Sequence, residues 1–312
     1  MTELDFIDWL RTVIRPDPRV PLGPGDDCAA VVWPTGSNLL VATDMLLEGS
    51  CFRLAEAGPR RVGRKAMAVN LSDMAAMAGQ PVAAVVSVGV PRGLSQEACR
   101  ELFLGLADRA QEFETAIVGG DTNSWDGGLT ISVTLLGTPT GSGPVRRSGA
   151  KPGDWLFVTG PLGGSIQGHH LDFMPRVREG QRLHAETQLR AMIDLSDGLA
   201  TDLRHLCRAS GCAARLEAAR IPIADAAREP NSPVPPLERA LGDGEDFELL
   251  FAVAPAEGAR LLASQPLGDL GCELHHIGEC LESGAATGGD LWLTHPDGRT
   301  GPLMLTGYTH TW

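Results

Sequence analysis

The stretch between residues 138 and 153 divides the chain into two parts that can each form a folded domain. It is rich in glycine and proline, and its apolar residues follow neither helical nor strand periodicity. Such a segment is typical of a surface connection. A chain of 312 residues is also long enough for two domains. We therefore predict one domain over residues 1–145 and a second over residues 146–312.

Helical and strand patterns alternate in both parts of the chain. In the first part, apolar spacing predicts helices over residues 4–14, 58–79 and 95–113, and strands over residues 38–43, 81–90 and 129–135. The run at 38–43 predicts a buried strand, whereas the alternation at 129–135 predicts a half-buried one. Ser95 is a candidate N-cap for the helix that follows it.

The second part repeats this mixture of elements. Its apolar runs predict strands over residues 155–159, 191–195 and 247–253, a helix from about Ser196, and a loop over residues 229–236. The two parts together predict an α/β fold with mixed α+β character. We expect an N-terminal mixed sheet with helices and a C-terminal α/β domain.

Charge and composition exclude several classes of protein. The chain has 26 Lys and Arg residues against 39 Asp and Glu residues, a net charge of −13, which argues against nucleic-acid binding. No apolar run approaches 18 residues and the N-terminus lacks a signal-peptide pattern, so we expect no membrane association. Seven cysteines without a Cys-x-x-Cys pair are typical of reduced thiols, which predicts a cytoplasmic protein.

Acidic residues recur beside glycine or at the ends of predicted elements. They occur in Gly25-Asp26-Asp27, Thr43-Asp44, Asn70 to Asp73, Gly119 to Thr122, Asp194 to Gly198, and Gly244 to Asp246. Each segment alone fits an ordinary turn or helix cap. Together they predict a cleft in which divalent cations separate carboxylates that would otherwise repel one another. Oxygen ligands favour Mg²⁺ or Mn²⁺, and the glycines let backbone N–H groups approach a phosphate.

No standard nucleotide motif accompanies these residues. Residues 58–65 approach a P-loop, but Arg64 occupies the lysine position and no Ser or Thr follows Lys65. The residues themselves therefore indicate a Mg²⁺-dependent enzyme acting on a nucleotide or phosphate, without identifying its substrate. The pentapeptides at 69–73 and 193–197 resemble each other, which is a weak indication of internal duplication.

At these residues the chain resembles the thiamine-monophosphate kinases, a family in the superfamily of aminoimidazole ribonucleotide synthetase and selenophosphate synthetase. The resemblance spans nearly the whole chain and rests on GPGDD (23–27), TDMLLEG (43–49), GRKAMAVNLSDMAAMAG (63–79), VGGDT (118–122), RSGAKPGDWLFVTGPLG (147–163), MIDLSDGL (192–199), GEDFELLF (244–251) and GY (307–308). It implies ATP-dependent phosphorylation of thiamine monophosphate to thiamine diphosphate by direct in-line transfer with several Mg²⁺ ions. It also implies a homodimer that pairs through its N-terminal sheets, with ATP bound between the domains.

The resemblance also assigns roles to individual residues. Metal ligands would be Asp27, Thr43, Asp44, Asp73, Asp121, Asp194 and Asp197. Contacts to ATP would come from Gly120, Asp121, Arg147 and Ser196, and contacts to thiamine monophosphate from Cys51, Glu245 and Tyr308. The side chains facing the phosphates, and therefore catalytic, would be Asp73, Asp121 and Asp197.

Cys51 is the main departure from the family, which has a substrate-contacting histidine at this position. It leaves two other interpretations open. The first is another ATP-dependent enzyme of the superfamily, acting on a different small phosphate or amide-like substrate. The second is a non-catalytic protein that binds nucleotide or thiamine phosphate. His169 and His170 are interpreted as part of a solvated loop rather than as a metal pair.

Overall fold

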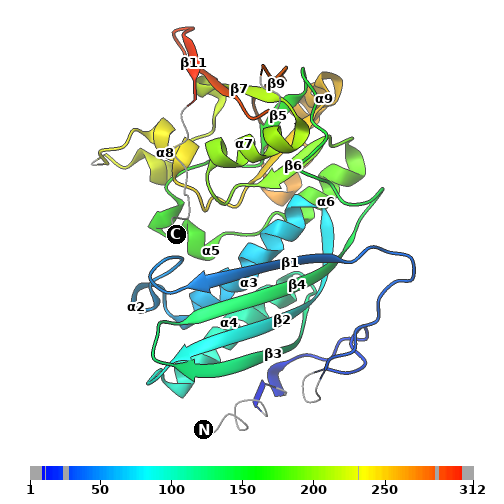
Figure 1. Cartoon of the computed structure of the whole chain (residues 1–312), viewed down its shortest axis with the longest axis vertical. Coiled ribbons are helices and arrows are strands. Elements are labelled where there is room, and N and C mark those ends of the chain that lie inside the picture. Colours follow the sequence, from blue (N-terminus) through cyan, green and yellow to red (C-terminus); the bar gives the residue numbers. More distant parts are fainter. Residues whose placement is uncertain (1–8, 11, 24–27, 231, 285–287, 304–312) are drawn as a thin grey trace. The chain divides into compact units, whose positions relative to one another are not determined.

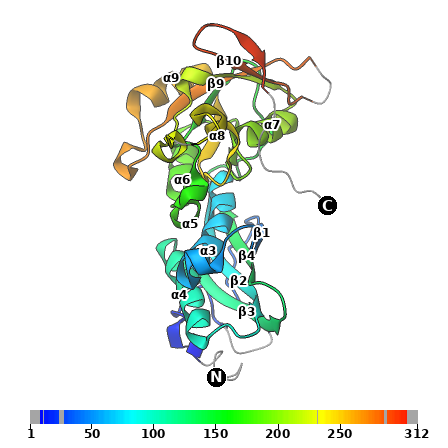
Figure 2. The same ribbon diagram turned by 90° about the vertical axis from the view of Figure 1, so that its left-hand side faces the viewer.

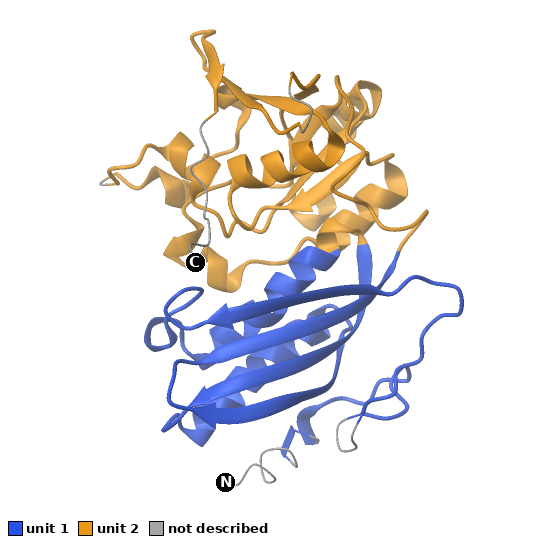
Figure 3. Ribbon diagram, in the orientation of Figure 1, with its two compact units in different colours: residues 1–74, 79–139 blue, residues 75–78, 140–312 orange. Residues whose placement is uncertain are grey.

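A computed structural model describes residues 9–10, 12–23, 28–230, 232–284 and 288–303. The chain forms two compact units, which Figure 3 shows in different colours. Unit 1 comprises residues 1–74 and 79–139, and unit 2 comprises residues 75–78 and 140–312. The mixed α/β character that the sequence predicts for both parts is confirmed.

Unit 1 is built on a sheet that has four strands within the described residues. These strands are β1 (Leu40–Leu47), β2 (Gly79–Pro91), β3 (Ala116–Trp125) and β4 (Thr130–Pro139), in the order β1-β4-β2-β3. Strands β2 and β3 are parallel, and the other pairs are antiparallel. The helices are α2 (Leu54–Ala57), α3 (Pro59–Ala76) and α4 (Gln96–Glu112). Helices α3 and α4 lie along one face of the sheet (Figure 2).

Strand β1 differs from the buried strand predicted over residues 38–43. Only Leu40 and Leu46 are buried, whereas Val41, Met45 and Leu47 are exposed. The reason is that β1 lies at an edge of a sheet whose helices cover one face, so every second side chain points away from them. Strand β4 shows the same alternation, and the half-buried strand predicted there is confirmed.

Two glycines bring helices α3 and α4 into close contact. A Cβ atom added at Gly63 would lie 2.0 Å from the Leu102 carbonyl oxygen, and one added at Gly105 would lie 2.0 Å from the Arg60 carbonyl oxygen. Helix α4 begins after Ser95, whose side chain accepts a hydrogen bond from the Ala98 N–H at 3.1 Å, so the predicted N-cap is confirmed. This rigid pair supports the sheet face that carries the pocket described below.

Unit 2 contains a second, mixed sheet. Its described strands are β5 (Trp155–Val158), β6 (Ala191–Asp194), β7 (Ala213–Glu217), β8 (Leu249–Val253), β9 (His275–Leu281), β10 (Leu291–Thr294) and β11 (Thr300–Pro302), in the order β11-β10-β7-β9-β5-β8-β6. Only the β7–β10 pair is parallel among these strands. Every residue of β8 is buried, because this strand lies inside the sheet.

Helices surround the sheet of unit 2. The α-helices are α5 (His169–Asp172), α6 (Val177–Glu186), α7 (Leu199–Ser210), α8 (Pro236–Gly242) and α9 (Pro255–Ser264). Short 3-10 turns are η1 (Ser165–Gln167), η2 (Ala218–Arg220), η3 (Asp225–Arg228) and η4 (Gly268–Leu270). In the part of the chain that the structure describes, none of the helices combines the length and apolar character needed to cross a bilayer.

Candidate functional site

Two sequence-predicted segments run side by side in unit 2. Residues 194–198 run from the last residue of strand β6 into the turn after it, and residues 243–248 precede strand β8. The backbone N–H of Glu245 donates to the Ser196 carbonyl oxygen at 2.7 Å, and that of Phe247 donates to the Leu195 carbonyl oxygen at 2.8 Å. The fold therefore joins the backbone of a residue predicted to contact ATP to that of a residue predicted to contact the acceptor.

Left-handed backbone geometry shapes both segments. Gly198 has a φ of 109°, and Gly244 has a φ of 73°. Glu245 and Phe247 have φ values of 54° and 53°, although side chains other than glycine adopt this region infrequently. Such conformations carry a cost and persist only where surrounding contacts impose them, a pattern typical of functional sites.

Helix α7 begins later than the sequence predicts. We expected it to start at about Ser196, but its first residue is Leu199, and its N-cap position is Gly198. The Asp202 carboxylate explains the difference, because its Oδ2 accepts hydrogen bonds from the N–H groups of Asp197 at 3.0 Å and Gly198 at 3.1 Å. A carboxylate from the first turn thus binds the preceding turn and leaves Asp197 outside the helix.

The acidic side chains of Asp194, Asp197 and Asp202 gather at this turn. Asp194 is buried, and Asp202 is also buried. Burial, followed by the charges of Asp194 and Asp197, raises the pKa of Asp202 to about 8. Sequence analysis missed Asp202, although its position in the first turn of a helix after an Asp-Gly pair was the available signal.

The acidic residues of unit 1 lie on different elements and faces. Asp44 on β1 pairs with Val133 on β4, which in turn pairs with Val86 on β2. Val133 and Val86 are buried, so this row of residues lies on the face that the helices cover. Asp121 on β3 pairs with Ser87, the residue after Val86 on β2. Because successive strand residues alternate, Asp121 lies on the face opposite to the helices. Because β1 and β3 are at opposite edges of a four-stranded sheet, these two residues are separated by about 14 Å. Asp73 belongs to helix α3.

Thr43 lies on the face opposite to Asp44, since successive strand residues alternate. Its hydroxyl is 3.1 Å from the Val133 carbonyl oxygen and 3.0 Å from the Thr134 hydroxyl. The structure therefore does not bring the Thr43 hydroxyl and the Asp44 carboxylate together. Asp27 and Tyr308, the other predicted site residues at the two ends of the chain, lie outside the described residues.

The donor chemistry fits hard cations. Within the described residues, no three His, Cys, Asp or Glu side chains form a group able to hold a metal ion. In unit 2, however, Asp194 and Asp197 lie close enough to Asp202 to raise its pKa. Carboxylate oxygens are ligands that Mg²⁺ prefers, and a cation between them would offset this repulsion. The residues present therefore suit Mg²⁺ rather than zinc.

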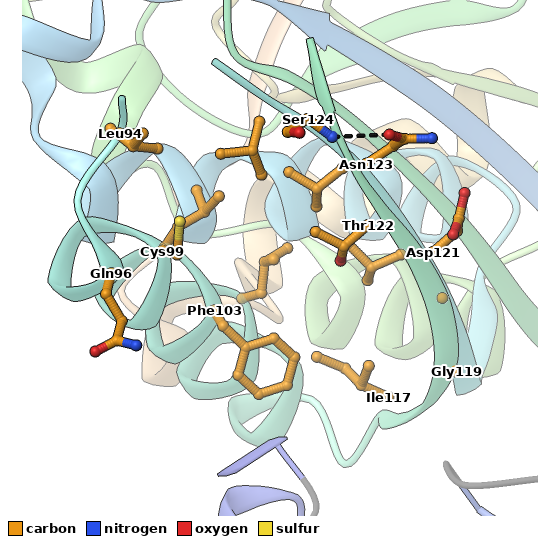
Figure 4. Close-up of a pocket in the computed structure, with 16 residues that line it drawn as sticks. Leu94, Gln96, Cys99, Phe103, Ile117, Gly119, Asp121, Thr122, Asn123 and Ser124 are labelled. Atoms are coloured by element: carbon orange, nitrogen blue, oxygen red, sulfur yellow. Dashed lines mark hydrogen bonds between the residues drawn. The ribbon is translucent and has the colours of Figure 1, made fainter. Parts of the chain in front are cut away.

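A pocket in unit 1 lies between helix α4 and strands β2 and β3. It has a volume of about 470 Å³, and its apolar wall includes Val86, Val88 and Phe103. Its other wall is residues 119–124, which include the predicted ATP contacts Gly120 and Asp121. The Asp121 side chain points away from the pocket (Figure 4), so this residue lines it with its backbone. A Cβ atom at Gly120 would lie 1.8 Å from the Val86 carbonyl oxygen, so only glycine fits there. The glycine therefore allows this backbone to form the pocket wall.

Cys51 sits in the turn after β1 and is partly exposed. The Leu47 N–H donates to its Sγ at 3.5 Å, and the buried Lys65 donates from Nζ to its carbonyl oxygen at 2.7 Å. Lys65, which sequence analysis did not select, thus holds this turn from helix α3. Arg147 is exposed, and its carbonyl oxygen accepts a hydrogen bond from the Ser210 hydroxyl.

The loop predicted at His169 and His170 is wrong, and so is the predicted exposure of His170, whereas His169 is exposed as predicted. These residues begin helix α5, and His170 is buried. Its Nδ1 lies 2.8 Å from the Ser165 carbonyl oxygen, so the imidazole is part of the internal packing. The strand predicted over residues 247–253 is shorter in the structure, where β8 begins at Leu249.

Comparison with known protein families identifies the class of protein to which this two-unit fold with acidic turns belongs. Residues 25–138 match the N-terminal domain of the AIR synthase related proteins, and residues 151–289 match their C-terminal domain. The thiamine-monophosphate kinase of Rhodopirellula baltica is 42% identical over 317 residues, covering 99% of this chain and 97% of the relative. The chain belongs to the thiamine-monophosphate kinase family.

Solved structures agree with this assignment. A thiamine-monophosphate kinase from Stenotrophomonas maltophilia K279a superimposes with a TM-score of 0.79 at 29% identity, covering 95% of this chain and 97% of that one. AaThiL complexed with AMPPCP and TMP has a TM-score of 0.71 at 26% identity, covering 99% and 97% of the two chains.

Proposed function

We propose that the protein transfers the terminal phosphoryl group of ATP directly to thiamine monophosphate, giving thiamine diphosphate and ADP. The observation that carries this proposal is the contact between residues 194–198 and 243–248. The Glu245 N–H is 2.7 Å from the Ser196 carbonyl oxygen, so a candidate acceptor contact lies beside a candidate ATP contact. Membership of the kinase family and the complex of AaThiL with AMPPCP and TMP support it.

The reaction requires the chain to bring two anions together. The acceptor is a phosphate oxygen that is already largely ionised near neutral pH, so the attack needs no strong general base. The chain must instead orient the acceptor in line with the terminal phosphorus while ADP leaves. Bound Mg²⁺ would neutralise charge on both phosphates. We assign the ligands of several Mg²⁺ ions to the predicted acidic set: Asp27, Thr43, Asp44, Asp73, Asp121, Asp194 and Asp197. Because Asp44 lies on the sheet face opposite to Thr43 and Asp121, it would serve a different ion from those two residues.

The remaining residues divide between the two substrates. The pocket beside Gly120 and Asp121 has apolar walls and a volume of about 470 Å³, which suit the purine base of ATP. Arg147 is exposed and carries a guanidinium group that can grip a phosphate. Ser196 lies at the turn beside Asp197, where phosphate oxygens would meet it. Glu245, Cys51 and Tyr308 are assigned to thiamine monophosphate.

The open face of the unit 1 sheet supports a homodimer. Its exposed apolar side chains include Val41, Met45 and Leu47 on β1, and Val85 on β2. Apolar residues gathered on one sheet face are typical of an interface. Sedimentation of the wild type should give a dimer, and Met45→Lys should shift it toward a monomer; a monomeric wild type would contradict the proposal.

The free cysteines suit a cytoplasmic location.

The proposed activity is tested with a panel of acceptors. The protein is incubated with ATP, Mg²⁺ and either thiamine monophosphate, thiamine or an unrelated small phosphate, and ADP release is followed. We expect ADP to form with thiamine monophosphate well above the other acceptors. Comparable or higher activity with a different phosphate would favour the alternative superfamily enzyme, which the Cys51 departure supports. Nucleotide binding without turnover would favour the non-catalytic alternative.

Replacing Cys51 with histidine tests the substrate contact in the turn after β1. We expect Cys51→His to lower the KM for thiamine monophosphate by about fivefold, since an imidazole can add one hydrogen bond worth about 1 kcal/mol. The KM for ATP should stay unchanged. Steady-state kinetics with each substrate varied in turn provide the measurement, with Cys51→Ser as the control. An unchanged KM for thiamine monophosphate would remove Cys51 from the substrate site.

A further inference from the structure

We propose that Asp246 is a positioning residue that holds Glu245 in the conformation needed to contact the phosphate acceptor. The proposal rests on the assignment of Glu245 to the acceptor site. Asp246 is 2% exposed, so its carboxyl group does not reach solvent and acts through its neighbours. Those neighbours belong to the glycine-rich turn that leads into η1 and to the first residue of η1.

The contacts of Asp246 connect two turns of unit 2. Its Oδ1 accepts hydrogen bonds from the Gly163 N–H at 2.9 Å and from the Ser165 hydroxyl at 2.8 Å. Its Oδ2 is buried and has no hydrogen-bond partner among the described residues. Oδ1 therefore accepts both of the described hydrogen bonds of this side chain.

The anchoring turn has little freedom to move. Gly163 and Gly164 have φ values of 88° and 78°. A Cβ atom at Gly163 would lie 2.7 Å from the Ala240 backbone nitrogen, so the turn packs directly against helix α8. The Gly164 N–H also donates to Asp243 Oδ2 at 2.9 Å, next to the segment that Asp246 holds. Asp246 is thus bonded to a closely packed turn.

Glu245 needs such a support because its backbone is unfavourable. Its φ of 54° lies in the left-handed region, and Phe247 on the other side of Asp246 has a φ of 53°. The Asp246 side chain links these two residues to the turn at 163–165, in addition to the backbone hydrogen bonds that Glu245 and Phe247 donate. Losing its hydrogen bonds would let Glu245 relax to a commoner conformation and turn its side chain elsewhere.

The protonation of Asp246 agrees with this role. Burial raises its pKa to about 7, and the hydrogen bonds from Gly163 and Ser165 only partly oppose this effect. A carboxyl group that holds its partners through Oδ1 alone resembles an asparagine amide in shape. Asparagine at position 246 should therefore preserve these hydrogen bonds, whereas alanine should remove them.

The test compares Asp246→Ala with Asp246→Asn. We expect Asp246→Ala to raise the KM for thiamine monophosphate about tenfold, the effect of losing buried hydrogen bonds, while the KM for ATP stays constant. Asp246→Asn should restore a nearly normal KM. Asp154→Ala is the matched control, because Asp154 is another buried aspartate of unit 2 that accepts a backbone hydrogen bond, from Lys151.

A double-mutant cycle and hydrogen exchange separate positioning from general destabilisation. In the Glu245→Gln background, Asp246→Ala should add little further effect, since both changes act on the same contact. Amide exchange at Glu245 and Phe247 should accelerate in Asp246→Ala but not in Asp246→Asn or Asp154→Ala. Additive kinetic effects, or unchanged exchange in Asp246→Ala, would overturn the proposal. The exchange result stands even if the wild type phosphorylates a different acceptor or none.

Discussion

Replacing Asp197 with asparagine should lower kcat by about 100- to 1,000-fold, the range seen when one group that stabilises a transition state is removed. Asp197 lies in the turn before helix α7, where its own N–H and that of Gly198 donate to Asp202. Those backbone hydrogen bonds do not use the Asp197 carboxylate, so asparagine should leave the turn intact. The substitution removes charge from the proposed Mg²⁺ site without removing volume.

The measurement is kcat at saturating ATP and thiamine monophosphate, together with thermal unfolding to verify the fold. Asp269→Asn is the control, since Asp269 is an exposed aspartate of unit 2 paired with Arg182. Asp121→Asn should resemble Asp197→Asn, because both residues are assigned to the phosphates. Full turnover in both Asp197→Asn and Asp121→Asn would contradict the role of the acidic turns.

Replacing Glu248 with alanine should lower the free energy of unfolding by about 3 kcal/mol, because the largely buried Arg176 loses its bidentate partner and keeps Glu179, whose carboxylate lies 3.1 Å away. Glu248 is 3% exposed, and its two carboxylate oxygens accept hydrogen bonds from Arg176 Nη2 at 2.7 Å and Nε at 2.8 Å. Its Oε2 also accepts from the Thr159 hydroxyl at 2.6 Å. The guanidinium would remain in the interior with its main acceptor removed.

Urea unfolding provides the measurement, and Glu279→Ala provides the comparison. Glu279 pairs with Arg215 in the same unit, but its side chain is 34% exposed, so its loss should cost about 1 kcal/mol or less. Equal destabilisation by the two substitutions would show that burial does not govern these ion pairs.

Local patterns predicted many elements of the fold because their signals lie within a few residues. The Ser95 cap depends only on residues within the same helical turn, and the alternation of apolar residues at 129–135 predicts strand β4 by itself. Strand β1 shows where such reasoning ends. Its apolar residues predict a strand correctly, but the sequence around it does not reveal that helices cover one face alone.

The site required contacts between distant parts of the chain. Lys65 binds the carbonyl of Cys51, and Asp246 binds the turn at 163–165, so neither role follows from local sequence. The similar pentapeptides at 69–73 and 193–197 were also misleading. The first lies within helix α3, whereas the second passes from strand β6 into a turn, so the similarity does not correspond to repeated structure.

Direct transfer of the terminal phosphate tests the central claim most sharply. The protein is incubated with Mg²⁺, thiamine monophosphate and ATP labelled in its terminal phosphate, and the products are separated. We predict that the label appears in thiamine diphosphate, in equal amount to the ADP formed, and that omission of thiamine monophosphate abolishes ADP release. Release of the label as inorganic phosphate, or ADP formation that is independent of the acceptor, would contradict the account.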